Sequence, residues 1–473
     1  MASNKYSKLL KNSLIFFIGN LGSKIISFVI VPFYTYVLSA AEYGTADLIT
    51  TTVNLLAPFV MVGMNEAVLR FSVSREDSVE GIATNSLMVV VAGCVLSWLL
   101  FPLFASVSII GDNVALFLLL LTLTCFNNVF LQLLRGIGKN KAFALNGVIT
   151  TFSMATANVV ALTIFHFGVK GYLASMLIAQ AVGALHIIVS CRLWELVAPK
   201  YIDWKLAKRM LVYCIPLIPN SLMWWIMSAS DRYVVLYFVG AAANGIYNVS
   251  QKIPSIVNVV YSIFMQAWQI SAIEERDSED NVRFQSTVFR YIFVVLAVAS
   301  SLIAASSYPV YTFLMDSSYV GSWQPVALLS LANLFSCIAS FFGTTYVVTK
   351  QSKKAFSTTV IGAAANIVLT LALVPIMGIM GAATATAASY ALIALVRYRD
   401  TCKMIKIAFH KAEVLMGLSI ISIQVVISFL PYSPVTLAVS FVLFAALLVV
   451  LRHGIADIVK RGRDVVLAQR GRR

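Results

Sequence analysis

A lysine close to the middle of a long apolar stretch is the first residue of this sequence that could do chemistry. Lys24 lies within residues 12–38, which are otherwise nearly unbroken apolar sequence. At ~1.5 Å per residue, a helix over this stretch places Lys24 ~18 Å from its start, near the midplane of a ~30 Å bilayer core. A lysine stem cannot reach the surface from that depth, so the ammonium needs a water-filled cavity or an anionic partner. We interpret Lys24 as a cation lining a central pathway, with helix packing against backbone carbonyls as the alternative.

Two more polar residues fall within predicted apolar helices. Lys252 lies about ten ångströms into its helix at ~1.5 Å per residue, so it could line the same pathway or extend to the outer surface. Pro254 could open this helix locally. Asn20 precedes Lys24 by four residues and shares its face, where it could bind a head group or another helix. Because lysines attract anions such as diphosphate, we predict an anion-binding cavity.

Four charged residues are candidates for coupling or gating. We expect Asp47 and Asp231 near the outer ends of their helices and Glu66 near an inner end. Glu66 precedes Arg70 by four residues, a spacing that favours an ion pair. We expect Asp231 and Arg232 to cap an outer helix end or to gate the outer mouth. A carboxylate could couple transport to H⁺ or Na⁺, but we predict none at mid-depth.

Composition places these residues in a membrane protein. The 473 residues are 60% hydrophobic and 12% charged, whereas soluble globular proteins are about 25% charged. Gly136, Ile137 and Gly138 lack the Gly-Lys-Ser/Thr that completes a phosphate-binding loop. The four histidines and six cysteines show no metal-ligand spacing. We predict a polytopic membrane protein that is not an enzyme and has no cofactor.

Apolar segments with turn or charge signals between them number fourteen, and each is long enough to cross a bilayer as a helix. Their approximate spans are residues 12–38, 45–66, 82–104, 114–134, 143–167, 171–191, 210–230, 246–270, 288–307, 323–349, 356–377, 379–396, 413–430 and 435–452. We therefore predict fourteen transmembrane helices.

Positive charge predicts the orientation of these helices. Nearly all of the 35 lysines and arginines fall on one side of the predicted membrane, and only Lys170 and Arg232 fall on the other. The positive-inside rule then places both termini in the cytoplasm. The net charge of +15 follows from this topology and does not indicate nucleic-acid binding. The longest inner linker, residues 192–209, is predicted to be amphipathic, and the longest outer connection is residues 231–245.

The two halves of the chain resemble each other. VLSAAEYG ends at Gly44 and VGAAANG ends at Gly245, an offset of 201 residues. Further shared patterns are K-A-F (Lys141, Lys354), A-N-[VI]-V (Asn158, Asn366) and G-[VI]-x-G (Gly168 and Gly171, Gly378 and Gly381). An even number of helices separates equivalent points, so the repeats share their orientation. We expect the substrate path to lie between the two lobes.

The repeat suggests that the two lobes contact a ligand through different side chains. At the offset of 201, Trp225 aligns with Lys24. One lobe could present a cation to an anion such as diphosphate and the other an aromatic face to the ligand, although packing in a helix core explains the tryptophan equally well. We assign residues 1–200 to an N-terminal lobe, 201–410 to a C-terminal lobe, and 411–473 to two extra helices and a basic tail.

Three stretches resemble one known group of transporters. They are LGSKIISFVIVPFYTYVLSAAEYG, IPLIPNSLMWWIMSASDRYVV and IMGIMGAATATAASY. They are similar to the Wzx-type O-antigen and capsule repeat-unit flippases, in the polysaccharide-export branch of the multidrug/oligosaccharidyl-lipid/polysaccharide (MOP) superfamily. The resemblance covers the whole chain. It implies an all-α, MATE-like fold with two six-helix lobes around a V-shaped cavity and two C-terminal helices.

The resemblance also implies a substrate, partners and a location. The substrate is a polyprenyl-diphosphate-linked oligosaccharide, moved from the inner to the outer leaflet of the bacterial cytoplasmic membrane by alternating access. Besides membrane lipids, the implied partners are a polysaccharide polymerase and chain-length proteins.

Other functions are compatible with parts of this pattern. A lipid II flippase is not separated from it by sequence. A multidrug exporter of the same superfamily typically has twelve helices and binds organic cations, which Lys24 would repel. A membrane polymerase or glycosyltransferase would need a large outer loop or an acid-rich domain, and the sequence has neither.

Overall fold

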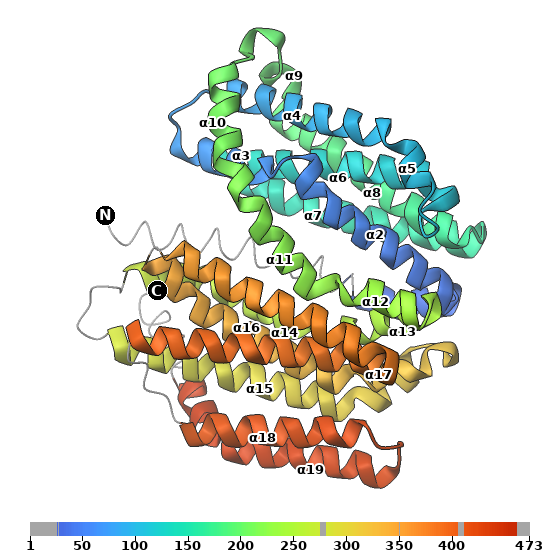
Figure 1. The fold of residues 1–473 in the computed structure, drawn as a ribbon, viewed down its shortest axis with the longest axis vertical. Helices are drawn as coiled ribbons and strands as arrows, with labels where there is room; N and C mark the ends of the chain where they lie inside the picture. The colour runs from blue at the N-terminus through green and yellow to red at the C-terminus, as the bar shows by residue number, and fades with distance from the viewer. Residues whose placement is uncertain (1–25, 27, 275–280, 350, 405–410, 461–473) are drawn as a thin grey trace, which may run out of the picture. The chain divides into compact units, whose positions relative to one another are not determined.

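Two compact units make up the chain, Met1–Trp225 and Ile226–Arg473. The computed structural model describes residues 26, 28–274, 281–349, 351–404 and 411–460, in which the regular structure is helical (Figure 1). The predicted all-α class is confirmed. The division at residues 200 and 410 remains a prediction.

The first unit is an assembly of helices around α6. Its elements are a helix at Phe28–Val37, α2 (Ala40–Val60), α3 (Met64–Ser74), α4 (Val79–Leu99), α5 (Phe101–Ala105), η1 (Gly111–Asn113), α6 (Val114–Gly136), α7 (Asn140–Val159), η2 (Val160–Ile164), α8 (Gly168–Cys191), α9 (Leu193–Leu196), η3 (Pro199–Tyr201), α10 (Trp204–Cys214), η4 (Ile215–Leu217) and the start of α11 (Ile218–Ala229). Helices α2, α3, α4 and α8 pack against α6. Its residues Phe117, Leu121, Cys125 and Phe130 are at most 1% exposed. A helix that is apolar on all sides belongs in such a core.

The linker after α8 is amphipathic, as predicted. In α10 the buried residues are Leu206, Ala207, Met210 and Cys214, which share one helical face. Trp204, at the start of the helix, is 72% exposed. These residues attach α10 to α3 and α4 within the first unit.

The second unit is built on α15, α16 and α17. Its elements are the end of α11, α12 (Asp231–Phe238), α13 (Ala241–Lys252), α14 (Ser255–Glu274), α15 (Asn281–Leu314), η5 (Ser317–Trp323), α16 (Val326–Val348), α17 (Ser352–Met404), α18 (Lys411–Ser428) and α19 (Pro434–Val450). The predicted outer connection at residues 231–245 is wrong, because α12 and α13 occupy most of it. The predicted opening at Pro254 is confirmed, since α13 ends at Lys252 and α14 begins at Ser255.

Helix α17 folds back on itself at Gly378. This residue has φ 57° and ψ −134°, a conformation that glycine adopts without steric cost. Asn366 and Thr386 would lie ~30 Å apart in a straight helix, yet the Asn366 amide donates to the Thr386 hydroxyl at 3.4 Å. The two predicted segments that meet at residue 378 are therefore the two arms of a helical hairpin. The matching Gly168 of the first unit also has a positive φ, 52°, in support of the internal repeat.

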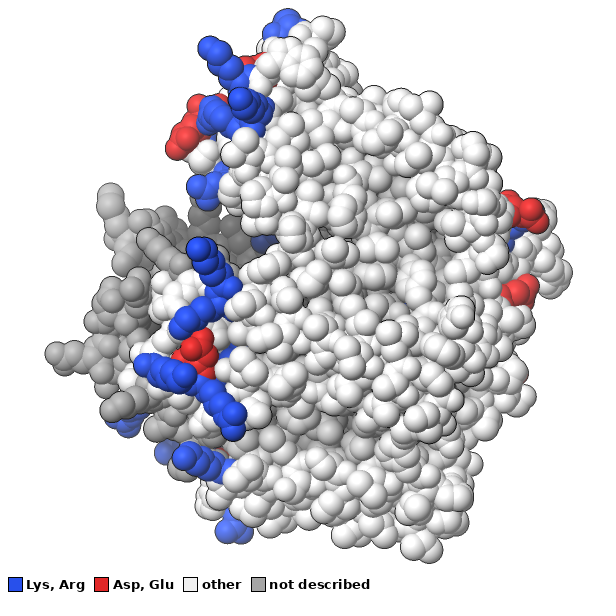
Figure 2. Space-filling model, viewed as in Figure 1, with Lys and Arg blue, Asp and Glu red and all other residues white. Residues whose placement is uncertain are grey.

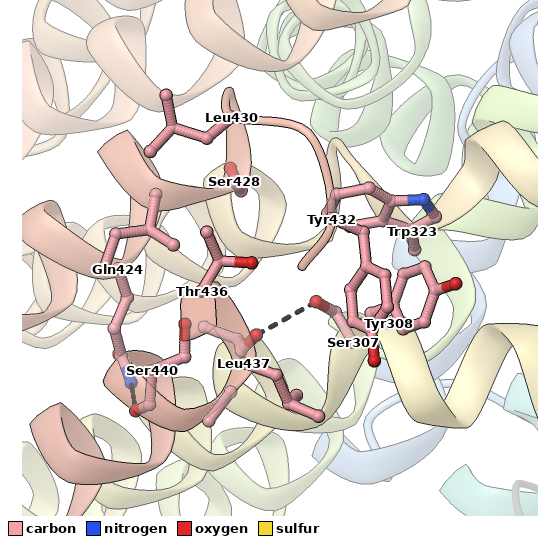
Figure 3. A pocket seen from close by; sticks show the side chains of 13 residues that line it. Ser307, Tyr308, Trp323, Gln424, Ser428, Leu430, Tyr432, Thr436, Leu437 and Ser440 are labelled. Atoms are coloured by element: carbon pink, nitrogen blue, oxygen red, sulfur yellow. Dashed lines mark hydrogen bonds between the residues drawn. The ribbon is translucent and has the colours of Figure 1, made fainter. Parts of the chain in front are cut away.

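Polar contacts attach α18 and α19 to the rest of the second unit. The Gln424 amide of α18 donates to the carbonyl oxygens of Ser440 at 3.0 Å and Ser301 at 3.3 Å. Such bonds hold membrane helices together because apolar surface alone gives little preference for helix over lipid. Figure 3 shows Gln424 and Ser440 on one side of a small cavity, with the aromatic rings of Tyr308, Trp323 and Tyr432 on the other.

The structure confirms a multi-pass membrane protein but not the count of fourteen spans. Among the described residues, nine helices are long and apolar enough to cross a membrane, or up to eleven if each bent pair is one span. Most of the predicted segment 12–38 lies outside the described residues. The segment 246–270 is divided at Pro254, and the segments 356–377 and 379–396 together form α17.

Positive charge gathers at one end of the helices in each unit. Figure 2 shows lysines and arginines there, and the rest of the visible face carries few charges. This distribution is the one that the sequence predicts. Which end faces the cytoplasm remains a prediction.

Candidate functional site

Asp231 is a buried carboxylate in the second unit, with its side chain 1% exposed. The Tyr247 hydroxyl donates to Oδ2 at 2.6 Å, and the Thr386 hydroxyl donates to the same oxygen at 3.3 Å. Among the described residues, Oδ1 has no hydrogen-bond partner. A buried carboxylate is costly unless its charge is compensated, so in a membrane protein it is by default a candidate functional group.

Three elements bring this cluster together. Asp231 is the first residue of α12, and α12 packs against α13, which carries Tyr247, and against α17, which carries Thr386. The hairpin at Gly378 adds Asn366 from the other arm of α17. Its carbonyl oxygen accepts a hydrogen bond from Ser230 at 3.3 Å. The cluster therefore depends on the break in α17.

A polar cavity of about 150 Å³ lies beside Asp231. Its polar lining includes Gln251, Asn258, Asn333 and Tyr390. The Asn258 amide donates to the Asn333 carbonyl oxygen at 2.8 Å, which joins α14 to α16 across the cavity wall. A cavity needs about 10–15 Å³ to hold one water, so this one has room for several. It can hold water, a proton carrier or a small cation next to the carboxylate.

Arg232 is the basic residue nearest to Asp231 in sequence. Its side chain contacts a residue that lines the cavity beside Asp231. Its Nη2 donates to Oε1 of Gln251 at 2.8 Å. Gln251 therefore connects the guanidinium to the cavity that Asp231 adjoins. The arrangement places a carboxylate, a guanidinium and a polar cavity within one unit.

The first unit has no carboxylate at the equivalent position. At the repeat offset of 201, Asp231 corresponds to Ile30, which is 8% exposed. Asn158, which corresponds to Asn366 in the repeat, makes a different contact: its amide donates to the Tyr34 hydroxyl at 3.0 Å. The Tyr34 ring lies 5.1 Å from that of Tyr172 and 5.5 Å from that of Tyr43. One unit thus has an aromatic cluster where the other has an acid.

The predicted ligand-binding residues are only partly described by the structure. Lys24 and Asn20 lie outside the described residues. Lys252 ends α13 and is partly buried, but it is not among the residues that line the cavity beside Asp231. Trp225 lies in α11 and is also partly buried. Their roles remain predictions.

The remaining predicted acids, Asp47 and Glu66, differ in how far they are buried. Asp47 is buried in α2, at 6% exposure. Glu66 is exposed in the first turn of α3 and accepts a hydrogen bond from Asn65 at 3.1 Å. The predicted Glu66–Arg70 ion pair is wrong, because the Arg70 guanidinium instead lies 5.0 Å from the centre of the Tyr213 ring. Helix α10 packs beside α3 and supplies this ring, which attracts the cation.

Sequence reasoning missed the partners of Asp231. Tyr247 and Thr386 are 16 and 155 residues away, and no local pattern links them to the acid. Asn366 was found only as a mark of the repeat. The one available signal was that Asn158 and Asn366 recur ten and twelve residues before Gly168 and Gly378, the first glycines of the shared G-[VI]-x-G pattern.

Comparison with protein families gives one match. The model of the polysaccharide biosynthesis protein family matches residues 9–270, more than half of the chain. A search of curated proteins found no match.

Solved structures share the fold at low identity. The lipid II flippase MurJ in an inward closed conformation is 12% identical, with a TM-score of 0.70, over 94% of this chain and 100% of that one. An inward-facing multidrug resistance MATE transporter of the MOP superfamily is 15% identical, with a TM-score of 0.62, over 87% and 95%. The MATE transporter VcmN of Vibrio cholerae is 13% identical, with a TM-score of 0.59, over 85% and 98%.

At these identities the solved structures show the fold alone, and the transporter role predicted from the sequence remains a proposal. The match over residues 9–270 and the shared fold assign the chain: it belongs to the polysaccharide biosynthesis protein family and has the MATE-like fold of the MOP superfamily.

Proposed function

We propose that this protein is a flippase for polyprenyl-diphosphate-linked oligosaccharide repeat units of O-antigen, capsule or exopolysaccharide. It moves them from the inner to the outer leaflet of the bacterial cytoplasmic membrane by alternating access, with both termini in the cytoplasm. The observation that carries the proposal is the family match over residues 9–270. A polysaccharide polymerase and chain-length proteins would use the product.

Lys24 is the residue that we propose binds the diphosphate. A lysine at membrane depth is stable only beside water or an anion, and a lipid diphosphate supplies the anion. Lys252 and Asn20 are proposed to assist, and Trp225 to present an aromatic face to a sugar. An organic cation would be repelled by the same lysine, which disfavours a multidrug exporter.

Asp231 is the proposed coupling group. A buried carboxylate with one oxygen left unbonded among the described residues, next to a polar cavity, is suited to take up H⁺ or Na⁺. Binding a cation would remove the cost of the buried charge and favour one conformation of the second unit. Arg232, Asp47 and Glu66 are proposed to act in gating.

A lipid II flippase is the second candidate, supported by the TM-score of 0.70 to MurJ. Deleting the gene separates the two. Cells without a lipid II flippase would fail to make cell wall, whereas cells without a repeat-unit flippase would lose surface polysaccharide and accumulate its lipid-linked precursor.

The deletion strain also tests Lys24. We expect Lys24→Ala to abolish surface polysaccharide while the protein remains in the membrane, because the diphosphate loses its counter-charge. Lys24→Arg should retain part of the activity, and Lys141→Ala, an exposed lysine, should retain all of it. Surface polysaccharide is measured by gel and glycan staining. Normal polysaccharide in Lys24→Ala would show that the lysine is not needed for transport. The same assay on Trp225→Ala tests whether this ring stacks on a sugar.

A further inference from the structure

A cavity with an apolar lining lies between α17 and α18 in the second unit. Its volume is about 370 Å³. Helix α16 forms its floor, because α16 packs against both α17 and α18. The floor side chains include Phe335 and Phe342 of α16, with Phe289 of α15 beside them. We refer to this cavity as the α17–α18 crevice.

Two helical faces line the sides of the crevice. On α17 the lining residues are Ala391, Ala394, Leu395 and Tyr398, and on α18 they are Lys411, Val414, Leu415 and Leu418. Both sets have the i, i+3, i+4, i+7 spacing of one helical face. Faces of this kind normally pack against a partner helix. Here they border open space, and Leu395 and Leu415 are 46% and 63% exposed.

Small side chains make the crevice deep. Ala391 and Ala394 leave room that larger residues would fill, while Phe289 and Phe342, each 2% exposed, close the inner wall. From Lys411 to Leu418 the crevice follows two turns of α18, a depth of ~10 Å. The hydrocarbon part of one leaflet is ~15 Å thick. An acyl chain could therefore lie in the crevice along most of that thickness.

One lining residue is charged, and it stands at the rim. Lys411 is exposed and forms no ion pair within the described residues. Its neighbour Glu413 is already bonded to Arg290 at 2.6 Å. Asp400, near the end of α17, is bonded to Lys354 at 3.3 Å and to the Tyr346 hydroxyl at 3.1 Å. The acids of this region therefore have cations or donors of their own, and Lys411 is left to attract an anion from outside the unit.

We propose that the α17–α18 crevice binds one anionic phospholipid, with an acyl chain between the two helices and its phosphate at Lys411. Apolar walls select a hydrocarbon chain, and the rim lysine selects a negative head group. A lysine near the surface adds about 1 kcal/mol of attraction to an anionic lipid, or about fivefold in affinity. This inference is independent of the transported substrate.

The test uses the full-length protein, purified and stripped of lipid. Native mass spectrometry counts bound phosphatidylglycerol and phosphatidylcholine of equal chain length, and thermal unfolding is followed with each lipid added. We expect wild type to prefer phosphatidylglycerol by about fivefold and to unfold at a higher temperature with it. Lys411→Gln should abolish this preference. Lys353→Gln, another exposed lysine outside the crevice lining, should keep it.

A second variant tests the chain-binding walls. Ala391→Leu adds bulk inside the crevice and should weaken binding of both lipids while leaving the helical content unchanged. Equal binding of the two lipids by wild type, or an unchanged preference in Lys411→Gln, would overturn the proposal. Displacement of phosphatidylglycerol by a tenfold lower concentration of polyprenyl phosphate would also overturn it, because the crevice would then be a site for the isoprenoid lipid.

Discussion

At the scale of single residues, the account depends on the charge of Asp231. The carboxylate is 1% exposed and accepts hydrogen bonds from Tyr247 and Thr386. An asparagine there keeps a carbonyl oxygen for both donors but cannot bind H⁺ or a cation by charge. The two functions of the side chain, structural and electrostatic, can therefore be separated.

We predict that Asp231→Asn lowers transport at least tenfold and changes the free energy of unfolding by only about 1 kcal/mol, because the hydrogen bonds survive. The measurement is surface polysaccharide in the deletion strain, together with thermal unfolding of the purified variant. Asp112→Asn, in an exposed position, is the matched control and should transport normally. Full transport by Asp231→Asn, with unchanged dependence on an ion gradient, would exclude a coupling role.

The sequence predicted Asp231 as a candidate but not its surroundings. Its position at the end of an apolar segment indicated an outer cap or gate, and the structure places it, buried, at the start of α12. Its burial could not be predicted, because the residues that cover the carboxylate come from α13 and α17. Spacing along the chain gives no information about such contacts when the partners are up to 155 residues apart.

At the scale of elements, the second unit depends on the fold-back of α17. Gly378, at φ 57° and ψ −134°, lets Asn366 meet Thr386 beside the acid. A side chain is disfavoured in that conformation by about 1–3 kcal/mol. The hairpin should therefore be sensitive to any substitution at this position.

We predict that Gly378→Ala destabilises the protein by about 1–3 kcal/mol and reduces transport, because the arms of α17 shift. The control is Gly147→Ala in α7, where an added Cβ meets no atom within 4 Å and helix propensity favours alanine by about 1 kcal/mol. Thermal unfolding in detergent compares the two. Equal melting temperatures for both variants would show that the break tolerates a side chain.

Helix positions were predicted better than helix continuity. The apolar segments at residues 114–134 and 171–191 correspond closely to α6 and α8, because long apolar runs have one stable form in a membrane. The predicted boundary between segments 356–377 and 379–396 also coincides with the break at residue 378. The bend between α2 and α3, 54°, was not, because Val62 and Gly63 adopt positive φ within a run that is apolar throughout.

At the scale of the whole molecule, two units share a sequence pattern but differ in chemistry. Both place a buried asparagine, Asn158 or Asn366, ahead of a positive-φ glycine. Only the second unit, among the described residues, adds a carboxylate beside that asparagine; the first has Tyr34. We infer that the repeat supplies a common scaffold, and that ion coupling is a property of the second unit.

Transport of a lipid-linked oligosaccharide is the central claim, and flipping in proteoliposomes tests it most directly. The purified protein is reconstituted with a polyprenyl-diphosphate-linked oligosaccharide, and a membrane-impermeant glycan-modifying enzyme reports the fraction that appears on the outer leaflet. The account predicts rapid exposure of the inner-leaflet lipid with wild type and slow exposure with Asp231→Asn or with protein-free vesicles. Exposure at the protein-free rate with correctly folded wild type under every ion gradient would contradict it.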